Sequence, residues 1–206
     1  MSVDINLIIY PSVVTKTFSN KDLYKNELFV YKLNIPHVPK LLSYGQTEAM
    51  NSNLWYITTK RVKGKPYLDE SFFNASQMGL AVAEFHKASL TSNKCLCHFD
   101  NQPKNILLTG SVYYFVDFTD SKIDFPETDI THLLLFWADE FDYKEFINLV
   151  TSFLNAYQRI ISLDPNRWAT CLNNSISRFD KRRQLFHKTT HSKHREINRC
   201  WLSEII

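Results

Sequence analysis

The stretch from His98 to Asn105 contains residue types that are suited to phosphoryl transfer. It reads His-Phe-Asp-Asn-Gln-Pro-Lys-Asn, so a carboxylate, Asp100, stands five residues before an amide, Asn105. Phosphoryl transfer depends mainly on positioning and charge neutralisation, and a carboxylate is needed to orient the attacking hydroxyl and accept its proton. We therefore expect Asp100 to be the catalytic residue.

A second aspartate, Asp117, follows an apolar run twelve residues after Asn105. Mg²⁺ prefers hard oxygen ligands and usually takes one or two carboxylates. A hairpin turning at residues 109–111 would bring Asp117 back beside Asn105. The pattern around Asp100 alone would also fit an ordinary polar loop. Its combination with Asp117 predicts a site in which Asn105 and Asp117 bind a metal.

The N-terminal part of the chain alternates strand and helix patterns that could support such a site. Residues 7–10 and 13–18 are typical of two strands joined by Pro11 and Ser12. From residue 20 the apolar period is helical and ends before Pro36. A second hairpin is predicted over 39–44 and 53–62, and the chain then breaks at Gly64 and Pro66. We place a lobe boundary here, so residues 1–62 form a reduced, β-rich N-lobe.

The remaining residues, 63–206, are predicted to form a larger helical lobe. Apolar residues at helical spacing occupy 78–85, and another stripe runs from Phe146 to Tyr157. Between them, 106–108 and 112–116 are predicted to form a hairpin at the entrance to the lobe, and the pattern is nearly all helical from Ile130 onward. The prediction is an α+β, bilobal chain.

The ordered set of motifs resembles the protein-kinase-like superfamily, in its aminoglycoside phosphotransferase, choline kinase and lipopolysaccharide-core kinase branch. His98 to Leu107 resembles the catalytic loop H-G-D-x-x-x-x-N-I-L, and Val116-Asp-Phe118 resembles the metal-binding segment. Three further segments resemble the hinge strand, the helix before the catalytic loop and the D-P-x-x-D-L segment: 56–64, 80–86 and 125–130. The resemblance extends over about residues 7–160 and implies a protein-kinase-like fold.

The resemblance also implies cofactors and roles. ATP and Mg²⁺ are the expected cofactors, and an ion pair between Lys16 and Glu27 would aim the lysine at the α- and β-phosphates. Nucleotide contacts are assigned to four residues: Lys16, Glu27, Lys60 and Val62. Structural support of the catalytic loop is assigned to His98 and Asp129. The implied reaction is ATP- and Mg-dependent phosphorylation of a hydroxyl on a small molecule, sugar or glycolipid.

Two departures from the family pattern leave an alternative open. No glycine precedes Gly45, so the Gly-rich loop that covers nucleotide phosphates is missing. Phe99 replaces the small residue that usually separates the histidine from the aspartate. The alternative is a catalytically weak or inactive kinase-like scaffold or nucleotide sensor.

Composition constrains the class and the compartment. Hydrophobic residues make up 44% of the chain, which is enough for a core, and no apolar run reaches the roughly 18 residues of a membrane span. The segment Met1–Asn6 lacks the basic region of a signal peptide. The four cysteines lack zinc spacing, so we expect reduced thiols in a cytoplasmic protein.

Positive charge gathers near the C-terminus, mainly in 178–199. From 177 to 206 there are eight Lys and Arg residues against three Asp and Glu residues, although the net charge of the chain is only +3. This basic segment could hold an anionic acceptor, or it could be a solvated helix face. A third alternative is that the protein works with an RNA-associated complex, but aromatic residues there are few.

Overall fold

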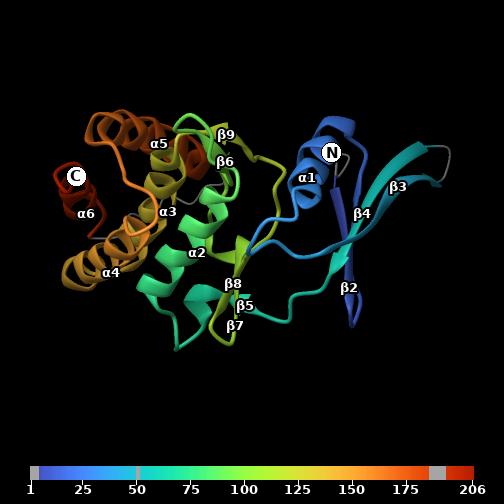
Figure 1. The fold of residues 1–206 in the computed structure, drawn as a ribbon, viewed down its shortest axis with the longest axis horizontal. Helices are drawn as coiled ribbons and strands as arrows, with labels where there is room; N and C mark the ends of the chain where they lie inside the picture. The colour runs from blue at the N-terminus through green and yellow to red at the C-terminus, as the bar shows by residue number, and fades with distance from the viewer. Residues whose placement is uncertain (1–4, 50–51, 186–193) are drawn as a thin grey trace.

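The computed structural model describes residues 5–49, 52–185 and 194–206, and these form two lobes (Figure 1). The smaller lobe contains a four-stranded antiparallel sheet in the order β1-β2-β4-β3, with one helix against it. Its elements are β1 (Ile5–Ile9), β2 (Val13–Phe18), α1 (Lys21–Lys32), β3 (Leu41–Ala49) and β4 (Ser52–Lys60).

Helix α1 forms where its sequence favours it. The Asn20 side chain caps the helix by accepting hydrogen bonds from the backbone N–H groups of Asp22 and Leu23. The buried Tyr24 and Leu28 join the hydrophobic core, and the helix also buries Glu27. It ends at Lys32, just before Asn34 adopts a left-handed conformation with φ of 48°. The predicted end before Pro36 is therefore confirmed.

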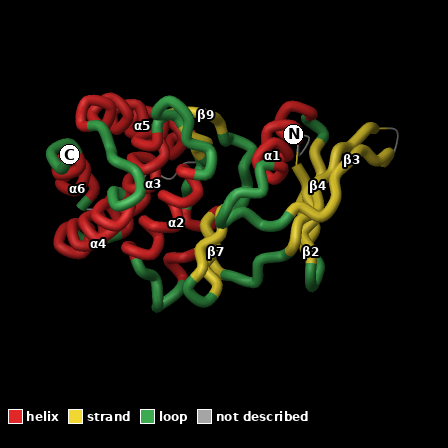
Figure 2. Tube along the Cα trace, in the orientation of Figure 1, coloured by secondary structure: helices red, strands yellow, loops and turns green. Residues whose placement is uncertain are grey.

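The larger lobe is mainly helical, with short strands on the side that faces the sheet (Figure 2). Its helices are α2 (Ala75–Lys87), α3 (Pro126–Glu140), α4 (Tyr143–Tyr157), α5 (Pro165–Leu185) and α6 (Arg195–Leu202). Its strands are β5 (Lys65–Pro66), β6 (Cys95–Cys97), β7 (Ile106–Thr109), β8 (Val112–Phe115) and β9 (Lys122–Asp124), and 3₁₀ turns cover Tyr67–Asp69 and Pro103–Asn105. The predicted α+β class, with a β-rich N-terminal region and a helical C-terminal region, is confirmed.

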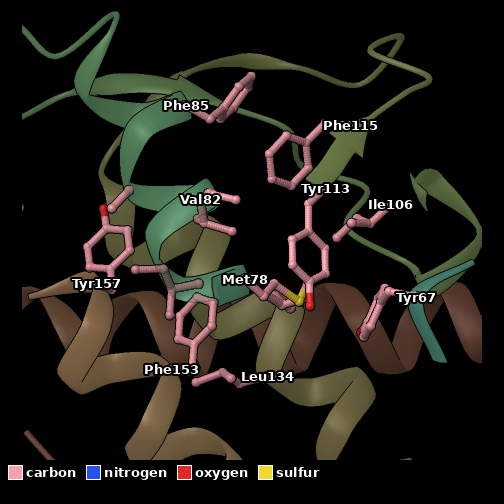
Figure 3. Close-up of a cluster of buried hydrophobic side chains, with 14 of the residues drawn as sticks. Tyr67, Met78, Val82, Phe85, Ile106, Tyr113, Phe115, Leu134, Phe153 and Tyr157 are labelled. Atoms are coloured by element: carbon pink, nitrogen blue, oxygen red, sulfur yellow. The ribbon is translucent and has the colours of Figure 1, made fainter. Parts of the chain in front are cut away.

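The core of the larger lobe lies between α2 and its neighbours (Figure 3). Met78 and Phe153 are fully buried there. Gly79 permits α2 and α4 to approach closely, because a Cβ at this position would lie 2.4 Å from the carbonyl oxygen of Phe153. Helix α2 also carries His86, which is hydrogen-bonded to Asp129 of α3.

The hairpin predicted between the two site segments is present as β7 and β8. Ile106 pairs with Phe115, and Gly110 makes the turn with φ of 59°. Immediately beyond the ladder, the N–H of Val116 donates to the carbonyl of Asn105 at 3.0 Å. The hairpin therefore returns the chain from Asn105 to Asp117, as the spacing predicted.

Two features were missed by the sequence patterns. Strands β6 and β9 pair with each other, and α3 begins at Pro126, four residues before the helical pattern was recognised. Proline is well tolerated in the first helical turn, so Pro126 starts the helix.

The lobe division at residue 62 stays a prediction. None of the helices in the described ranges is long and apolar enough to cross a bilayer. The segment Met1–Asp4 and part of the basic segment, 186–193, lie outside the described residues.

Candidate active site

A cavity of about 490 Å³ opens between the sheet of the smaller lobe and the β7–β8 hairpin of the larger one. Its apolar wall comes from alternate residues of the edge strand β1 and from the hairpin, including Leu7, Ile9, Leu107 and Val116. Six of the residues predicted to bind nucleotide or metal line it: Lys16, Glu27, Lys60, Val62, Asn105 and Asp117. The fold therefore collects side chains that are up to a hundred positions apart in the sequence.

Lys16 lies at the centre of the charged part of this cavity. Strand β2 presents its ammonium 2.6 Å from Glu27 Oε2 and 2.7 Å from Asp117 Oδ1. The predicted ion pair with Glu27 is present, and the contact with Asp117 extends it to the other lobe. The lysine side chain is 12% exposed and that of Glu27 only 2%, whereas Asp117 is 38% exposed. Lys16 and Glu27 are thus largely buried, whereas the carboxylate of Asp117 is exposed to the cavity.

Burial and neighbouring charges shift the pKa values of Lys16, Glu27 and Asp117 in opposite directions. Burial raises the pKa of Glu27 to about 7, even though Lys16 acts to lower it. Burial disfavours the charge on Lys16, but the two carboxylates outweigh it and raise the lysine pKa. Asp117 is also partly desolvated, yet attraction and a hydrogen bond from Lys16 hold its pKa below the ordinary value. Lys16 and Asp117 are therefore charged at neutral pH, while Glu27 titrates there.

Asp100 lies on the catalytic loop, with its side chain 12% exposed. Its Oδ2 accepts hydrogen bonds from Gln102 Nε2 at 2.7 Å and from Asn105 Nδ2 at 2.9 Å. Its Oδ1 lies 3.2 Å from the guanidinium of Arg182, which comes from α5. The carboxylate is thus fixed in orientation by two amides and by one cation.

Asp129 on α3 supports the catalytic loop through hydrogen bonds to the loop backbone. Its carboxylate accepts hydrogen bonds from the backbone N–H groups of His98 and Phe99, both at 2.9 Å. Asp129 is deeply buried, but hydrogen bonds and charge from His86 and His98 keep its pKa well below the ordinary value. The braced loop holds Phe99 at a φ of 64°, a conformation that bulky residues rarely adopt. The support predicted for Asp129 has a direct structural basis.

His98 links the catalytic loop, residues 98–107, to residues 116–121, called the metal loop here because they contain Asp117. Its Nε2 lies 2.9 Å from the carbonyl of Val116, while its Nδ1 accepts the backbone N–H of Asp100 at 3.3 Å. Asp117, next to Val116, adopts a left-handed φ of 68°. Strained backbone of this kind persists only where the surroundings impose it, and it clusters at functional sites. The predicted supporting position of His98 fits these contacts.

Other positioning residues were not recognised from the sequence. His86 on α2 is hydrogen-bonded to Asp129 Oδ2 at 3.1 Å and to the Tyr157 hydroxyl at 2.9 Å, so it supports Asp129 from a distant helix. Asn26 on α1 donates to the carbonyls of Thr119 and Ser121 at 2.7 and 2.8 Å. No local pattern marks these polar residues, because their partners lie on distant elements.

The donor set at the mouth of the cavity fits a divalent cation. Asp117 offers a partly exposed carboxylate, and both hydrogen bonds of the Asn105 side chain to Asp100 use Nδ2, which leaves its amide oxygen as a ligand. Oxygen donors of this type suit Mg²⁺, which keeps several positions for water and phosphate. The structure therefore fits the metal ligands that the sequence predicts, Asn105 and Asp117.

The described part of the basic segment makes many intramolecular ion pairs. Arg199 pairs with Asp180 at 2.8 Å, and Arg183 pairs with Asp139 of α3. Arg182 contacts Asp120 at 3.0 Å in addition to Asp100. Part of this charge, in the described residues, therefore stabilises the packing of α5 and α6, while Lys181 is exposed and Arg182 is 34% exposed.

A family model described as APH, phosphotransferase enzyme family, matches residues 58–169. This range is more than half of the chain and contains the catalytic loop and the metal loop. The chain belongs to the APH phosphotransferase family. This finding confirms the predicted resemblance. No curated protein matches the chain significantly in sequence.

Solved structures of APH-like kinases share the fold. The amicoumacin kinase hAmiN, in complex with AMP-PNP, Ca²⁺ and Ami, has a TM-score of 0.68 at 11% identity, covering 99% of this chain and 89% of its own. A microcompartment-associated aminopropanol kinase has a TM-score of 0.61 at 12% identity, with 98% and 87% covered. A choline/ethanolamine kinase family protein from Mesorhizobium loti has a TM-score of 0.58 at 12% identity, with 100% and 87% covered. At such low identity the likeness supports the fold alone.

Proposed function

We propose that this APH-family protein transfers the γ-phosphoryl group of Mg·ATP to a hydroxyl group of a small molecule, sugar or glycolipid. The observation that carries this proposal is the convergence of Lys16, Asp117 and Asn105 on one cavity, with Asp100 hydrogen-bonded to Asn105. A cation, two metal-ligand types and a base are the parts that phosphoryl transfer needs.

In the proposed mechanism, nucleotide lies in the cavity between the lobes. The apolar walls from Ile9 and Leu107 suit the adenine ring, and Lys60 and Val62 lie on the same lining. Lys16, held by Glu27, faces the phosphates. Mg²⁺ bound by Asp117 and Asn105 would neutralise charge on those phosphates.

On the acceptor side, Asp100 orients the hydroxyl that attacks the γ-phosphorus. The hydroxyl oxygen forms the new bond to phosphorus, and the bond from phosphorus to the bridging oxygen of ADP breaks. The hydroxyl proton passes to Asp100. Because Gln102 and Asn105 hold Oδ2, the proton is received at Oδ1, the oxygen that faces Arg182.

No glycine precedes Gly45, so the turn between β1 and β2 lacks the glycines that let a backbone approach phosphates closely. In the described residues, the first hairpin turns at Pro11–Ser12 between β1 and β2. Lys16 and a metal ion bound by Asn105 and Asp117 would instead contact the phosphates. Nucleotide affinity is therefore expected to depend strongly on divalent cation.

The test compares ATP consumption by the wild-type chain and by Asp117→Asn, with and without Mg²⁺, against a panel of hydroxyl compounds. We expect Mg-dependent turnover in the wild type and its loss in Asp117→Asn, with an unchanged circular-dichroism spectrum. Asp69→Asn, an exposed aspartate, is the matched control and should retain turnover. Full activity in Asp117→Asn would refute the metal assignment. A wild type that neither binds nor consumes Mg·ATP would support the scaffold alternative.

A further inference from the structure

We propose that Arg178 and Arg182 of α5, together with Lys122 of β9, form a subsite for an anionic group of the acceptor beside Asp100. The anionic group is a phosphate or a carboxylate. This inference rests on the proposed function, because it names the chemical class of molecule whose hydroxyl Asp100 would activate.

Arg182 stands where the acceptor must arrive. It lies 3.2 Å from Asp100 Oδ1 and 3.0 Å from Asp120 Oδ2, and its side chain is 34% exposed. Since the other oxygen of Asp100 is held by Gln102 and Asn105, an acceptor hydroxyl must approach the oxygen that Arg182 contacts. The acceptor therefore meets a guanidinium group.

The ring of Phe99, the residue before Asp100, makes cation–π contacts with two further cations, Lys122 and Arg178. Lys122 Nζ lies 4.0 Å from the centre of its ring and Arg178 Cζ lies 4.5 Å from it. The ring attracts cations through its quadrupole but has no net charge, so it positions them without neutralising them. Phe99 is itself buried and is tethered by its N–H to Asp129. The unusual phenylalanine of the catalytic loop thus serves as a platform for positive charge.

The two arginines belong to one face of one helix. Arg178 and Arg182 are four residues apart on α5, so their side chains are neighbours. Burial and the adjacent charge of Arg182 both lower the pKa of Arg178, which indicates that the positive charges are close together. Arg178 is also attracted by three carboxylates, those of Asp120, Asp129 and Asp100. An anionic group of the acceptor would take the place of Asp100 and Asp120 beside Arg182 and make charge-assisted hydrogen bonds with the guanidinium groups.

The arrangement also explains how an anionic acceptor would be selected. Its anionic group would compete with Asp100 and Asp120 for Arg182. As Arg182 turns to the acceptor, Asp100 Oδ1 becomes available to the hydroxyl. A neutral acceptor has no charge with which to draw the guanidinium away, so Arg182 would remain paired with the catalytic carboxylate.

The test measures binding directly, so that it does not depend on turnover. Three related compounds serve as probes in calorimetric titrations of the full chain: glucose 6-phosphate, glucuronate and glucose. We expect at least one anionic probe to bind about tenfold or more tightly than glucose, since hydrogen bonds between charged groups are stronger than neutral ones. The phosphate and carboxylate arms separate the two possible anionic groups.

Variants then locate the binding. The double substitution Arg178→Gln with Arg182→Gln should weaken binding of the anionic probe about tenfold and should not weaken binding of glucose. Lys181→Gln, which removes one charge at an exposed neighbouring position, should bind like the wild type. Arg182→Lys should retain part of the affinity because it keeps the charge. If the double variant does not fold, Arg178→Gln alone is the test and should weaken the same binding severalfold.

Anionic probes that bind no more tightly than glucose would overturn the inference, as would unchanged binding in the Arg178 and Arg182 variants. Binding and consumption of Mg·ATP are measured in parallel on the same samples. Loss of nucleotide activity with intact anion binding would refute the proposed function and leave the subsite. Intact nucleotide activity without anion preference would refute the subsite alone.

Discussion

On the nucleotide side of the cavity, Asp117 is paired with a lysine from the opposite lobe, and that lysine is paired with the nearly inaccessible Glu27. On the acceptor side, Asp100 is held by two amides of its own loop and by Arg182 from the distant helix α5. The first arrangement requires contact between lobes, whereas the second is built entirely within the larger lobe. Under the proposed function, nucleotide binding depends on how the lobes meet, whereas acceptor binding depends on the larger lobe alone.

Among the variants considered, substitution of Asp100 should have the largest effect on turnover. Asp100→Asn keeps the hydrogen-bonding shape but cannot accept the hydroxyl proton, so we expect kcat to fall about a thousandfold. Binding of Mg·ATP, measured by calorimetry, should remain within about twofold, because Asp100 lies outside the nucleotide cation cluster. A parallel loss of nucleotide affinity would show that the two sides are not separate.

The brace beneath the catalytic loop should have the next largest effect. Asp129→Ala removes two hydrogen bonds to backbone N–H groups and leaves His86 without its buried carboxylate. We expect the free energy of unfolding to fall by about 3 kcal/mol in denaturant titrations. The exposed Asp69→Ala is the control and should change it by less than about 0.5 kcal/mol. Equal effects of the two variants would contradict the bracing role.

The nucleotide side should show a pH dependence that is set by Glu27. The ion pair with Lys16 needs ionised Glu27, whose pKa of about 7 lies above its ordinary 4.5. We expect kcat/KM for ATP to rise about tenfold from about pH 6 to about pH 8 as this group loses its proton. In Glu27→Gln the rise should disappear. A rise that persists in this variant would assign the titration to another group.

The same shift has the opposite consequence for stability. Between about pH 4.5 and about pH 7 the folded protein binds more protons at Glu27 than the unfolded chain does. The stabilising contribution of the protonated group is therefore fully present below about pH 4.5 and is lost as the pH rises through about 7. Comparison of urea unfolding for the wild type and Glu27→Gln over this range measures the effect, which should be absent in the variant.

The smallest effect is expected from Asn26, which links α1 of the smaller lobe to the metal loop of the larger lobe. Asn26→Ala removes hydrogen bonds from α1 to the carbonyls of Thr119 and Ser121 in the metal loop. We expect a severalfold rise in the Mg²⁺ concentration needed for half-maximal activity, in line with the roughly 1 kcal/mol of a single buried hydrogen bond. Anion binding at Arg182 should not change. A change in anion binding would mean that the metal loop also positions the acceptor side.

Local sequence was sufficient for the parts of the site that are contiguous or joined by a short hairpin. The spacing of His98, Asp100 and Asn105, followed by Asp117 after a glycine turn, predicts one site because a β-hairpin returns the chain to its starting point. The apolar periods likewise predicted the helix α1 and the hairpin β7–β8 in outline. The Lys16–Glu27 pair needed the order of motifs as well, since neither residue is distinctive alone.

Only the tertiary structure shows which distant side chains meet at the candidate site. The contacts of Arg182 with Asp100, Asn26 with Thr119 and His86 with Asp129 join residues 43 to 93 positions apart, and the sequence has no local period that encodes them. The basic segment shows the same limit. Its composition revealed the charge, but packing determined that Arg183 and Arg199 stabilise helix contacts while Arg178 and Arg182 face the catalytic loop. Long-range electrostatic pairing depends on where helices pack, which composition alone leaves undetermined.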